Sequence, residues 1–203
     1  MIAIGGNPSK GITIDDYTNA AAILGVEVAT IRAISAVESS TRGPFDQIGR
    51  PTILFERHYF HKLTGGKYDS SNPTISQSSW GGYGLYSSQY GKLATAFALD
   101  PDAALKSVSW GAFQIMGKNH SSAGYGTVQD MVIAMLESEK NHLTAVTAFI
   151  KSNKAMLSAL KDKNWAKFAK LYNGAGYAKN KYDEKLKAEY LKFSPKPPPI
   201  YIP

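Results

Sequence analysis

The sequence predicts an α+β fold that is mostly helical and carries one small β-hairpin or sheet element. Apolar residues recur at helical spacing along most of the chain, one short run is rich in β-branched and aromatic residues, and no linker or internal repeat divides the 203 residues. Hydrophobic residues make up 43% and charged residues 19%, as in ordinary globular proteins. We therefore expect a single domain over residues 1–203, with an irregular lead-in at 1–12 and an extended, proline-rich tail at 194–203.

Capping residues and apolar periodicity define the expected helices. Thr13 or Asp15 is placed to cap the first helix. Pro101 takes the first position of a later helix, where its missing N–H is not needed. The expected helices cover residues 15–25, 27–39, 90–99, 101–108, 127–152, 154–160, 165–172 and 181–193.

The β element is expected at Thr52–Phe60, because TILFERHYF is rich in residues that favour strands. A turn-rich stretch, 40–51, precedes it. Residues 64–91 are rich in Gly, Ser and Tyr and are expected to form a long loop with room for a short hairpin. Long loops inside compact domains often carry function.

Several classes of chemistry lack support in the sequence. There are no cysteines, no HExxH run and no G-x-S-x-G run. His58 and His61 are three positions apart, and on the expected strand they would point to opposite faces. We therefore expect no metal site and no cofactor.

The net charge of +7 is unevenly distributed along the chain. Residues 1–136 carry ten basic and ten acidic side chains, whereas residues 137–203 carry 13 lysines and six acidic residues. Such a one-sided positive surface either attracts polyanions or simply keeps a helical surface soluble. No nucleic-acid-binding motif accompanies the charge, so nucleic acid is not an expected partner.

Glu38 is the first candidate catalytic residue. It stands at the C-terminal end of an expected buried helical stripe formed by Val28, Ile31, Ile34 and Val37. Burial disfavours a charged carboxylate and raises its pKa, which keeps a general acid protonated near neutral pH. The alternative is an exposed glutamate at a helix end.

Two more carboxylates follow closely and can supply a partner for Glu38. Asp46 lies in the turn, with Thr52 six positions after it, and Glu56 lies in the expected strand. Glycoside hydrolysis usually needs two carboxyl groups, one as acid and the other as base or nucleophile. Glu56 can instead be a structural partner of a neighbouring arginine or histidine.

Two downstream clusters carry polar side chains among aromatic ones. In SWGAFQIMG (109–117), Gly111 permits close backbone approach and the Gln114 amide can bind sugar hydroxyls or an N-acetyl group. In KLYNGAGY (170–177), Tyr172 and Asn173 end a helix. The alternative interpretations are a buried glutamine that satisfies the backbone and ordinary helix capping.

Taken in order, these clusters resemble the lysozyme superfamily. Glu38-Ser39, Gly111-x-x-Gln114 and Tyr172-Asn173 are arranged as in goose-type lysozymes and lytic transglycosylases, where the Glu is the general acid and the other segments line the sugar cleft. A closer resemblance is to the phage and prophage N-acetylmuramidase family, which includes endolysins of phages that infect Gram-negative bacteria. It covers about residues 12–193 and rests on the runs GRPTILFERHYF, SWGAFQIMG, YNGAGY and NKYDEKL.

The resemblance implies a lysozyme-like helical fold and cleavage of peptidoglycan between N-acetylmuramic acid and N-acetylglucosamine. It implies Glu38 as the acid and places Gln114, Tyr172 and Asn173 at the sugar. The second carboxylate stays open. Glu56 lies in the family's ILFE-x-H run, whereas the spacing from Glu38 to Asp46 and Thr52 is similar to that of T4-type phage lysozymes, which makes Thr52 a further substrate-binding candidate.

Two other functions compete with a hydrolytic muramidase. In a lytic transglycosylase, Glu38 would act as both acid and base and yield anhydro-muramyl products. A non-catalytic module would use only the basic surface to bind a polyanion. Aromatic residues of the long loop, Trp80 among them, either stack on sugar faces or pack the loop.

The remaining expectations concern partners and location. No stretch approaches the ~20 apolar residues that span a bilayer, and the start does not have the pattern of a signal peptide. We expect a monomer that is made in the bacterial cytoplasm and acts on the wall, in the periplasm, after release. No separate wall-binding module is expected, and the lysines at 151–192 are candidates for binding anionic outer-membrane lipid.

Overall fold

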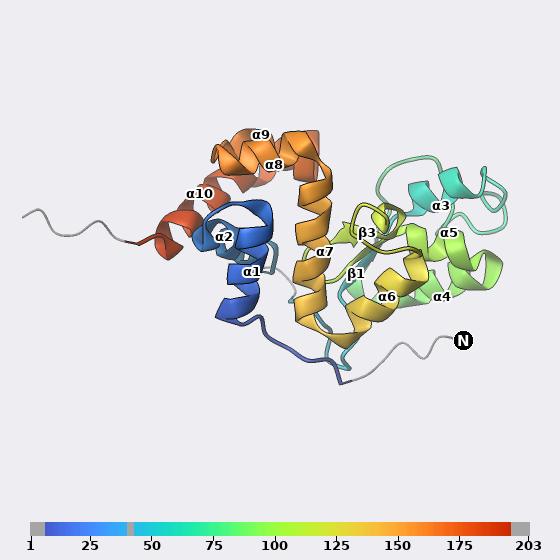
Figure 1. Cartoon of the computed structure of the whole chain (residues 1–203). Coiled ribbons are helices and arrows are strands. Elements are labelled where there is room, and N and C mark those ends of the chain that lie inside the picture. Colours follow the sequence, from blue (N-terminus) through green and yellow to red (C-terminus); the bar gives the residue numbers. More distant parts are fainter. Residues whose placement is uncertain (1–6, 40–42, 196–203) are drawn as a thin grey trace, which may run out of the picture.

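The computed structural model describes residues 7–39 and 43–195 (Figure 1). Part of the expected lead-in, part of the turn after Glu38 and most of the expected extended tail at 194–203 lie outside the described residues. The α-helices in the described part are α1 Ile14–Leu24, α2 Val28–Ser39, α3 Arg57–Leu63, α4 Gln89–Leu99, α5 Pro101–Lys106, α6 Val128–Glu137, α7 Glu139–Ser152, α8 Lys154–Lys161, α9 Trp165–Asn173 and α10 Tyr182–Phe193. The 3₁₀ helices are η1 Tyr86–Ser88, η2 Gly117–Asn119 and η3 Ala175–Asn180.

One small antiparallel sheet completes the fold, so the expected mostly helical α+β class is confirmed. Its strand order is β1 (Ile53–Phe55), β2 (Val108–Trp110) and β3 (Ile115–Met116). Ile53 pairs with Trp110, and Ser109 pairs with Met116. Trp110 is fully buried, so the sheet contributes to the same apolar core as the helices.

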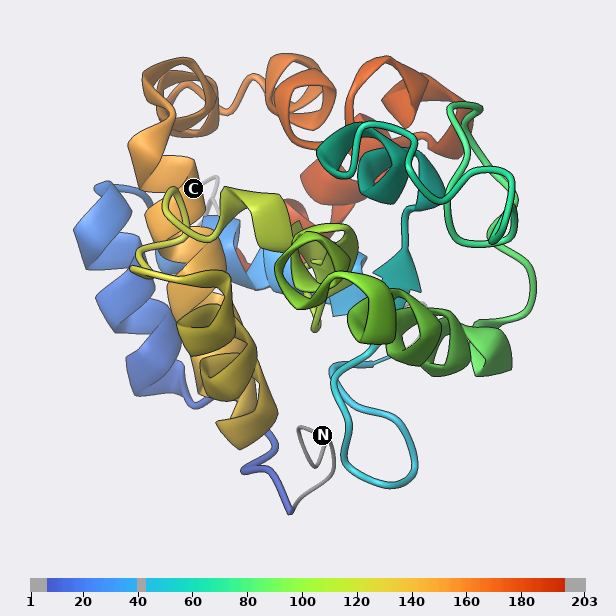
Figure 2. The same cartoon turned by 90° about the vertical axis from the view of Figure 1, so that its right-hand side faces the viewer.

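Helix α7 stands at the centre of the molecule (Figure 1). Helices α1, α2 and α8–α10 gather on one side of it, and the sheet with α3–α6 lies on the other. Helix α10 packs against α2, so the C-terminal part of the chain supports the helix that carries Glu38. Figure 2 shows α9 and α10 next to the loop that joins α3 to α4.

Most helix boundaries follow from local signals. Thr13 caps α1 through a reciprocal bond with Asp16, and Gly25 ends it in the left-handed conformation with a φ of 65°. Asp100 caps α5 and is followed by Pro101. The Thr13 cap and the position of Pro101 are as expected, and α1, α2 and α8–α10 lie where they were expected.

The expected strand at Thr52–Phe60 is wrong beyond Phe55. The Glu56 N–H still bonds to the carbonyl of Ser107 at 2.9 Å, but the chain then turns into α3. In the helix, Phe60 is fully buried, with its ring 6.0 Å from that of Phe55. His58 and His61 therefore do not point to opposite faces, because residues three apart on a helix are neighbours.

The expected single helix at 127–152 is interrupted at Ser138, whose backbone is extended. Ser9 inserts there: its N–H bonds to the carbonyl of Glu137, and its carbonyl accepts the N–H of Glu139, each at 2.9 Å. The helix therefore breaks because a distant segment replaces its hydrogen bonds.

Two smaller differences concern short elements. The helix expected at 101–108 ends at Lys106, because Val108 enters β2. In the described loop 64–88 there is no hairpin, only turns and η1. No single helix in the described residues is long and apolar enough to cross a membrane; α1 and α2 reach that length only together, with a bend of 112° between them.

Candidate active site

A cleft of about 630 Å³ opens beside the end of α2. Its walls come from α2, from the loop between α3 and α4, and from the segment that runs from the end of α9 into α10. The lining side chains that matter for chemistry are Glu38, Trp80, Asn173, Tyr177, Lys179 and Lys185. Glu38 is the acidic residue among the described residues that line it.

Glu38 is held in its neutral form by its surroundings. Its Oε1 atom is buried and has no hydrogen-bond partner among the described residues. Burial raises the pKa of Glu38 to about 8, so the carboxyl is mostly protonated at neutral pH. A protonated carboxyl in a cleft is able to donate a proton to a bound substrate.

Tyr172 lies beneath the acid and connects it to the sheet. Its hydroxyl donates to the carbonyl of Phe113 at 2.8 Å, and its ring stacks on that of Phe168 at 5.6 Å. Burial, together with the nearby charge of Glu38, raises the pKa of Tyr172 far above its usual value. Tyr172 is therefore a neutral donor whose hydrogen is already engaged.

Gln114 lies in the turn between β2 and β3, next to Phe113, and Thr52 directly precedes β1 and contacts that turn. The Gln114 amide donates to the carbonyls of Gly111 at 2.8 Å and Thr52 at 3.2 Å. The Thr52 hydroxyl donates to the carbonyl of Gly43 at 2.8 Å, and Thr52 is only 4% exposed. The donors of both side chains are thus engaged within the protein.

Asp46 has the opposite electrostatic character to Glu38. Burial raises its pKa, but hydrogen bonds from the backbone and side chain of Arg50 and from the backbone of Ile48 outweigh burial, so the pKa lies below its usual value. The side-chain contact, from Arg50 Nε to Asp46 Oδ2, is 2.7 Å. Asp46 is therefore an ionised carboxylate that organises its own turn, and it is not among the residues that line the cleft.

Glu56 occupies an intermediate position. It is 8% exposed, burial raises its pKa, and hydrogen bonding from Tyr83 only partly offsets that rise. Its Oε2 atom lies 3.3 Å from Nδ1 of His58. The ring of Trp80 is 5.8 Å from His58 and 6.0 Å from Tyr83, so Glu56 is separated from the cleft wall by one layer of side chains.

The loop that carries Trp80 is held firmly despite its irregular backbone. Arg57 donates to Ser79 at 3.0 Å, and Lys92 donates to the carbonyls of Gly82 and Tyr83 at 2.8 and 2.7 Å. Trp80 is nevertheless 75% exposed. An exposed indole on an anchored loop beside the acid is a suitable surface for a sugar ring.

The structure thus brings Glu38, Tyr172 and Asn173 together, as the ordered motifs indicate. It links Gln114 and Thr52 to them through the backbone around Phe113. The sequence interpretation did not single out Lys179 or Lys185. The signal for them was present, because the runs YNGAGY and NKYDEKL flank or contain these positions.

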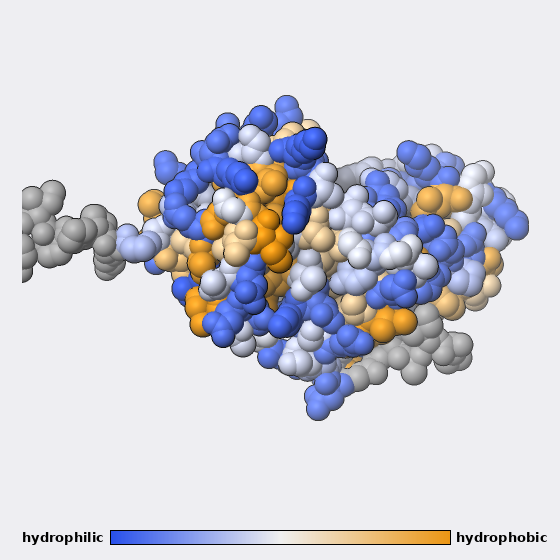
Figure 3. All heavy atoms as spheres, viewed as in Figure 1, coloured by the Kyte–Doolittle hydropathy of each residue, from blue (hydrophilic) through white to orange (hydrophobic). Residues whose placement is uncertain are grey.

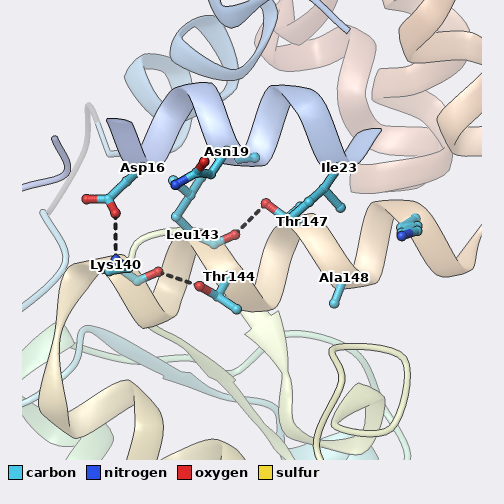
Figure 4. Close-up of a pocket in the computed structure, with 10 residues that line it drawn as sticks. Asp16, Asn19, Ile23, Lys140, Leu143, Thr144, Thr147 and Ala148 are labelled. Atoms are coloured by element: carbon cyan, nitrogen blue, oxygen red, sulfur yellow. Dashed lines mark hydrogen bonds and ion pairs between the residues drawn. The ribbon is translucent and has the colours of Figure 1, made fainter. Parts of the chain in front are cut away.

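A second pocket, of about 280 Å³, lies between α1 and α7 (Figure 4). Its acidic group, Asp16, bonds to Lys140 at 2.9 Å, and this contact holds the pKa of Asp16 at about 2. Much of the remaining lining is apolar, and Figure 3 shows apolar surface over this region. The pocket therefore has no group that can act as an acid at neutral pH. Across residues 7–39 and 43–195, no three His, Asp or Glu side chains are grouped as a metal site.

A mostly helical domain with a small antiparallel sheet and a protonated carboxyl in a cleft defines a glycoside hydrolase of the lysozyme type. The family model for N-acetylmuramidase matches residues 27–194, and the chain belongs to this family. Among solved structures, the crystal structure of Burkholderia AP3 phage endolysin is similar, with a TM-score of 0.84 and 41% sequence identity. The match covers 89% of this chain and 70% of that one. No curated protein sequence matches significantly.

Proposed function

We propose that this protein is an endolysin that hydrolyses the β-1,4 bond between N-acetylmuramic acid and N-acetylglucosamine in peptidoglycan, with Glu38 as the general acid. The observation that carries the proposal is the buried, unpartnered Oε1 of Glu38 in an open cleft, with a pKa of about 8. A buried polar atom without a partner is costly, so its retention at a cleft favours a role in binding or catalysis.

The chemistry follows from this protonation state. Glu38 donates its proton to the glycosidic oxygen as the bond from the anomeric carbon to that oxygen breaks. The sugar develops oxocarbenium character, and a water molecule supplies hydroxide to the anomeric carbon while its proton returns to a carboxylate. Tyr172 positions the floor of the cleft, and the exposed Asn173 offers its amide to sugar hydroxyls or an N-acetyl group.

Of the two candidates for a second carboxylate, the contacts favour Glu56. The Asp46 oxygens are held by Arg50 and Ile48, and releasing them would disrupt the turn. Glu56 Oε2 has no hydrogen bond within the described residues, so this oxygen is free to take up a proton. Gln114 and Thr52 then act by holding the turn beneath the cleft rather than through their donors.

A lytic transglycosylase is the second candidate. It is supported by the cleft itself, where Glu38 is the acidic residue among the described lining residues. In that reaction Glu38 would protonate the leaving oxygen and then take a proton from the sugar's own hydroxyl. No water is added, and an anhydro ring closes.

Digestion of purified peptidoglycan, followed by mass analysis of the products, tests both functions. Hydrolysis gives products with reducing N-acetylmuramic acid ends. Each is heavier than the corresponding anhydro product by one water molecule, about 18 mass units. We expect reducing ends, and we expect Glu38→Gln to lose roughly 10³-fold or more in rate. Glu27→Gln, at the other end of α2 and paired with Lys163, is the matched control. Anhydro products, or a Glu38→Gln enzyme as active as its parent, would refute the proposal.

We further propose that the protein is a monomer that is made in the bacterial cytoplasm and reaches its periplasmic substrate after release. The exposed lysines at 151–192 support an additional contact with anionic outer-membrane lipid. Binding to vesicles with and without anionic lipid, at low and high salt, tests that contact.

A further inference from the structure

We propose that Lys179 and Lys185 bind the carboxylate that muramic acid carries through its lactyl group, so that the enzyme selects strands bearing this negative charge. That carboxylate is either the free lactyl acid or an acid of the stem peptide attached to it. The inference rests on the proposed function, because it concerns the substrate of the same cleft.

The two lysines stand on one wall of the cleft that contains Glu38. Lys179 belongs to η3, and Lys185 lies one turn into α10. Both side chains are exposed. The segment that carries them packs against α2 and α9, so the lysines are presented by a supported part of the chain.

Neither lysine has an ion-pair partner among the described residues, although neighbouring lysines do. Lys181 pairs with Glu184 at 3.5 Å, and Lys192 pairs with Glu189 at 2.6 Å. The lysines of this segment that line the cleft are therefore left with their charge available.

The positive charge of Lys179 and Lys185 does not account for the protonation state of Glu38. A lysine close to Glu38 would favour its ionised form and lower its pKa, whereas burial accounts for the observed rise without any such contribution. The two lysines therefore do not set the protonation state of Glu38, although they line the same cleft.

The glycan carries one kind of group whose charge is opposite to that of the two lysines. Its sugar rings and N-acetyl groups are neutral, and the negative charge lies on the lactyl substituent of muramic acid or on the peptide that extends it. The exposed indole of Trp80 suits a neutral sugar face, whereas two ammonium groups suit a carboxylate. The cleft therefore separates an aromatic surface for the sugar from a cationic surface for its substituent.

The test compares three ligands with a double variant, Lys179→Gln/Lys185→Gln. The ligands are glycan strands with stem peptides, strands stripped by an amidase so that the lactyl acid is free, and chitotetraose, which has no carboxylate. The control, Lys10→Gln/Lys62→Gln, removes two exposed lysines outside the cleft and makes the same change in net charge.

We expect the double variant to lose roughly five- to tenfold in kcat/KM on strands that carry carboxylates, while its inhibition by chitotetraose stays unchanged. Loss on stripped strands alone assigns the contact to the free lactyl acid, and loss on peptide-bearing strands alone assigns it to an acid of the stem peptide. Loss on both strand types means that the two lysines bind either carboxylate. Converting the substrate carboxylates to amides should lower the rate of the parent to that of the variant.

Equal rates for parent and double variant on both strand types would overturn the inference, as would an equal loss in the control. A similar weakening of chitotetraose inhibition would also overturn it, because the lysines would then act on neutral sugar. The proposed function is refuted by a different result, namely that the parent enzyme yields no reducing N-acetylmuramic acid ends.

Discussion

Two titratable side chains are pushed towards their neutral forms by burial, but only one of them faces an open cleft. Burial raises the pKa of Glu38 to about 8 and lowers the pKa of His142 to about 4. His142 uses both ring nitrogens: Nδ1 accepts the N–H of Ala112 at 3.1 Å, and Nε2 donates to the carbonyl of Met135 at 2.7 Å. Glu38 leaves Oε1 unpartnered.

The contrast separates a structural buried group from a reactive one. His142 replaces a hydrogen bond that Met135 would otherwise receive from Glu139, because the Glu139 N–H bonds to Ser9. Gly111, with a φ of 70°, lets the imidazole approach to 2.7 Å from where a Cβ would stand, which is the close approach predicted for this glycine. Burial alone therefore does not mark the active site; burial with a free polar atom at a cleft does.

The largest effect of pH should appear in the activity at alkaline pH. Glu38 acts in its protonated form, so kcat/KM should fall about tenfold per pH unit above a pKa of about 8. That amounts to roughly 50-fold between pH 8 and pH 10, because half of the carboxyl is already ionised at pH 8. Turnover of glycan strands at constant ionic strength measures it. A rate that stays constant to pH 10 would mean that Glu38 is not the acid.

The second effect is a gain in stability on removing the acid. The folded-state pKa of Glu38 is raised above its unfolded value, so its contribution to stability is complete below about pH 4.5 and is lost as the pH rises through 8. Glu38→Gln cannot ionise and should be more stable by about 3 kcal/mol at pH 7, with little difference at pH 4. Denaturant unfolding of both proteins at the two pH values measures this; a constant difference would exclude a raised pKa.

The third effect concerns acid lability at His142. Its folded-state pKa is depressed, so its neutral form supports the fold above about pH 6.5, and stability is lost as the pH falls towards 4. We expect a loss of about 2 kcal/mol by pH 5 from this residue. His142→Gln should be less stable at pH 7 but should lack this part of the pH dependence. The half-buried His120, changed to Gln, is the control and should retain it.

The smallest effect on stability is expected from removing the charge of Asp46. Its pKa is depressed, so its ionised form stabilises the turn at neutral pH, and this contribution is lost as the pH falls below about 4. Asp46→Asn should cost about 1–2 kcal/mol at pH 7 without changing the rate per folded molecule. A double-mutant cycle with Arg50→Gln measures the pair. A large loss of activity at full stability would instead make Asp46 the second carboxylate.

Local signals were sufficient for much of the fold. Thr13 and Pro101 carry their positional preference in the residue type, so the starts of their helices could be predicted. The break at Ser138 could not, because the apolar periodicity continues across it and the cause is Ser9, far away in the sequence. The start of α3 was missed for a related reason: Glu56 makes no side-chain cap, and burial of Phe60 decides the conformation.

In the candidate site, too, some features could be predicted from the sequence and others could not. The position of Glu38 on a buried stripe was visible in the sequence, and its raised pKa follows from that stripe. The hydrogen-bond partners of Asp46 and Gln114 could not be predicted, because the residue type alone does not tell whether a carboxylate or amide faces a cleft or a turn. Lys179 and Lys185 were counted in a diffuse positive surface, since only the folded chain brings them into the cleft that Trp80 also lines.

The pairing of Ser9 with Ser138 has a practical consequence for engineering. The N-terminal segment does not merely precede the first helix; it holds the elbow between α6 and α7, on which the position of His142 depends. A peptide or carrier domain fused upstream should therefore join before residue 7, so that Ser9 keeps its place. Trimming the chain to Ile14 would remove that brace and loosen the scaffold behind the cleft, however intact the catalytic residues remained.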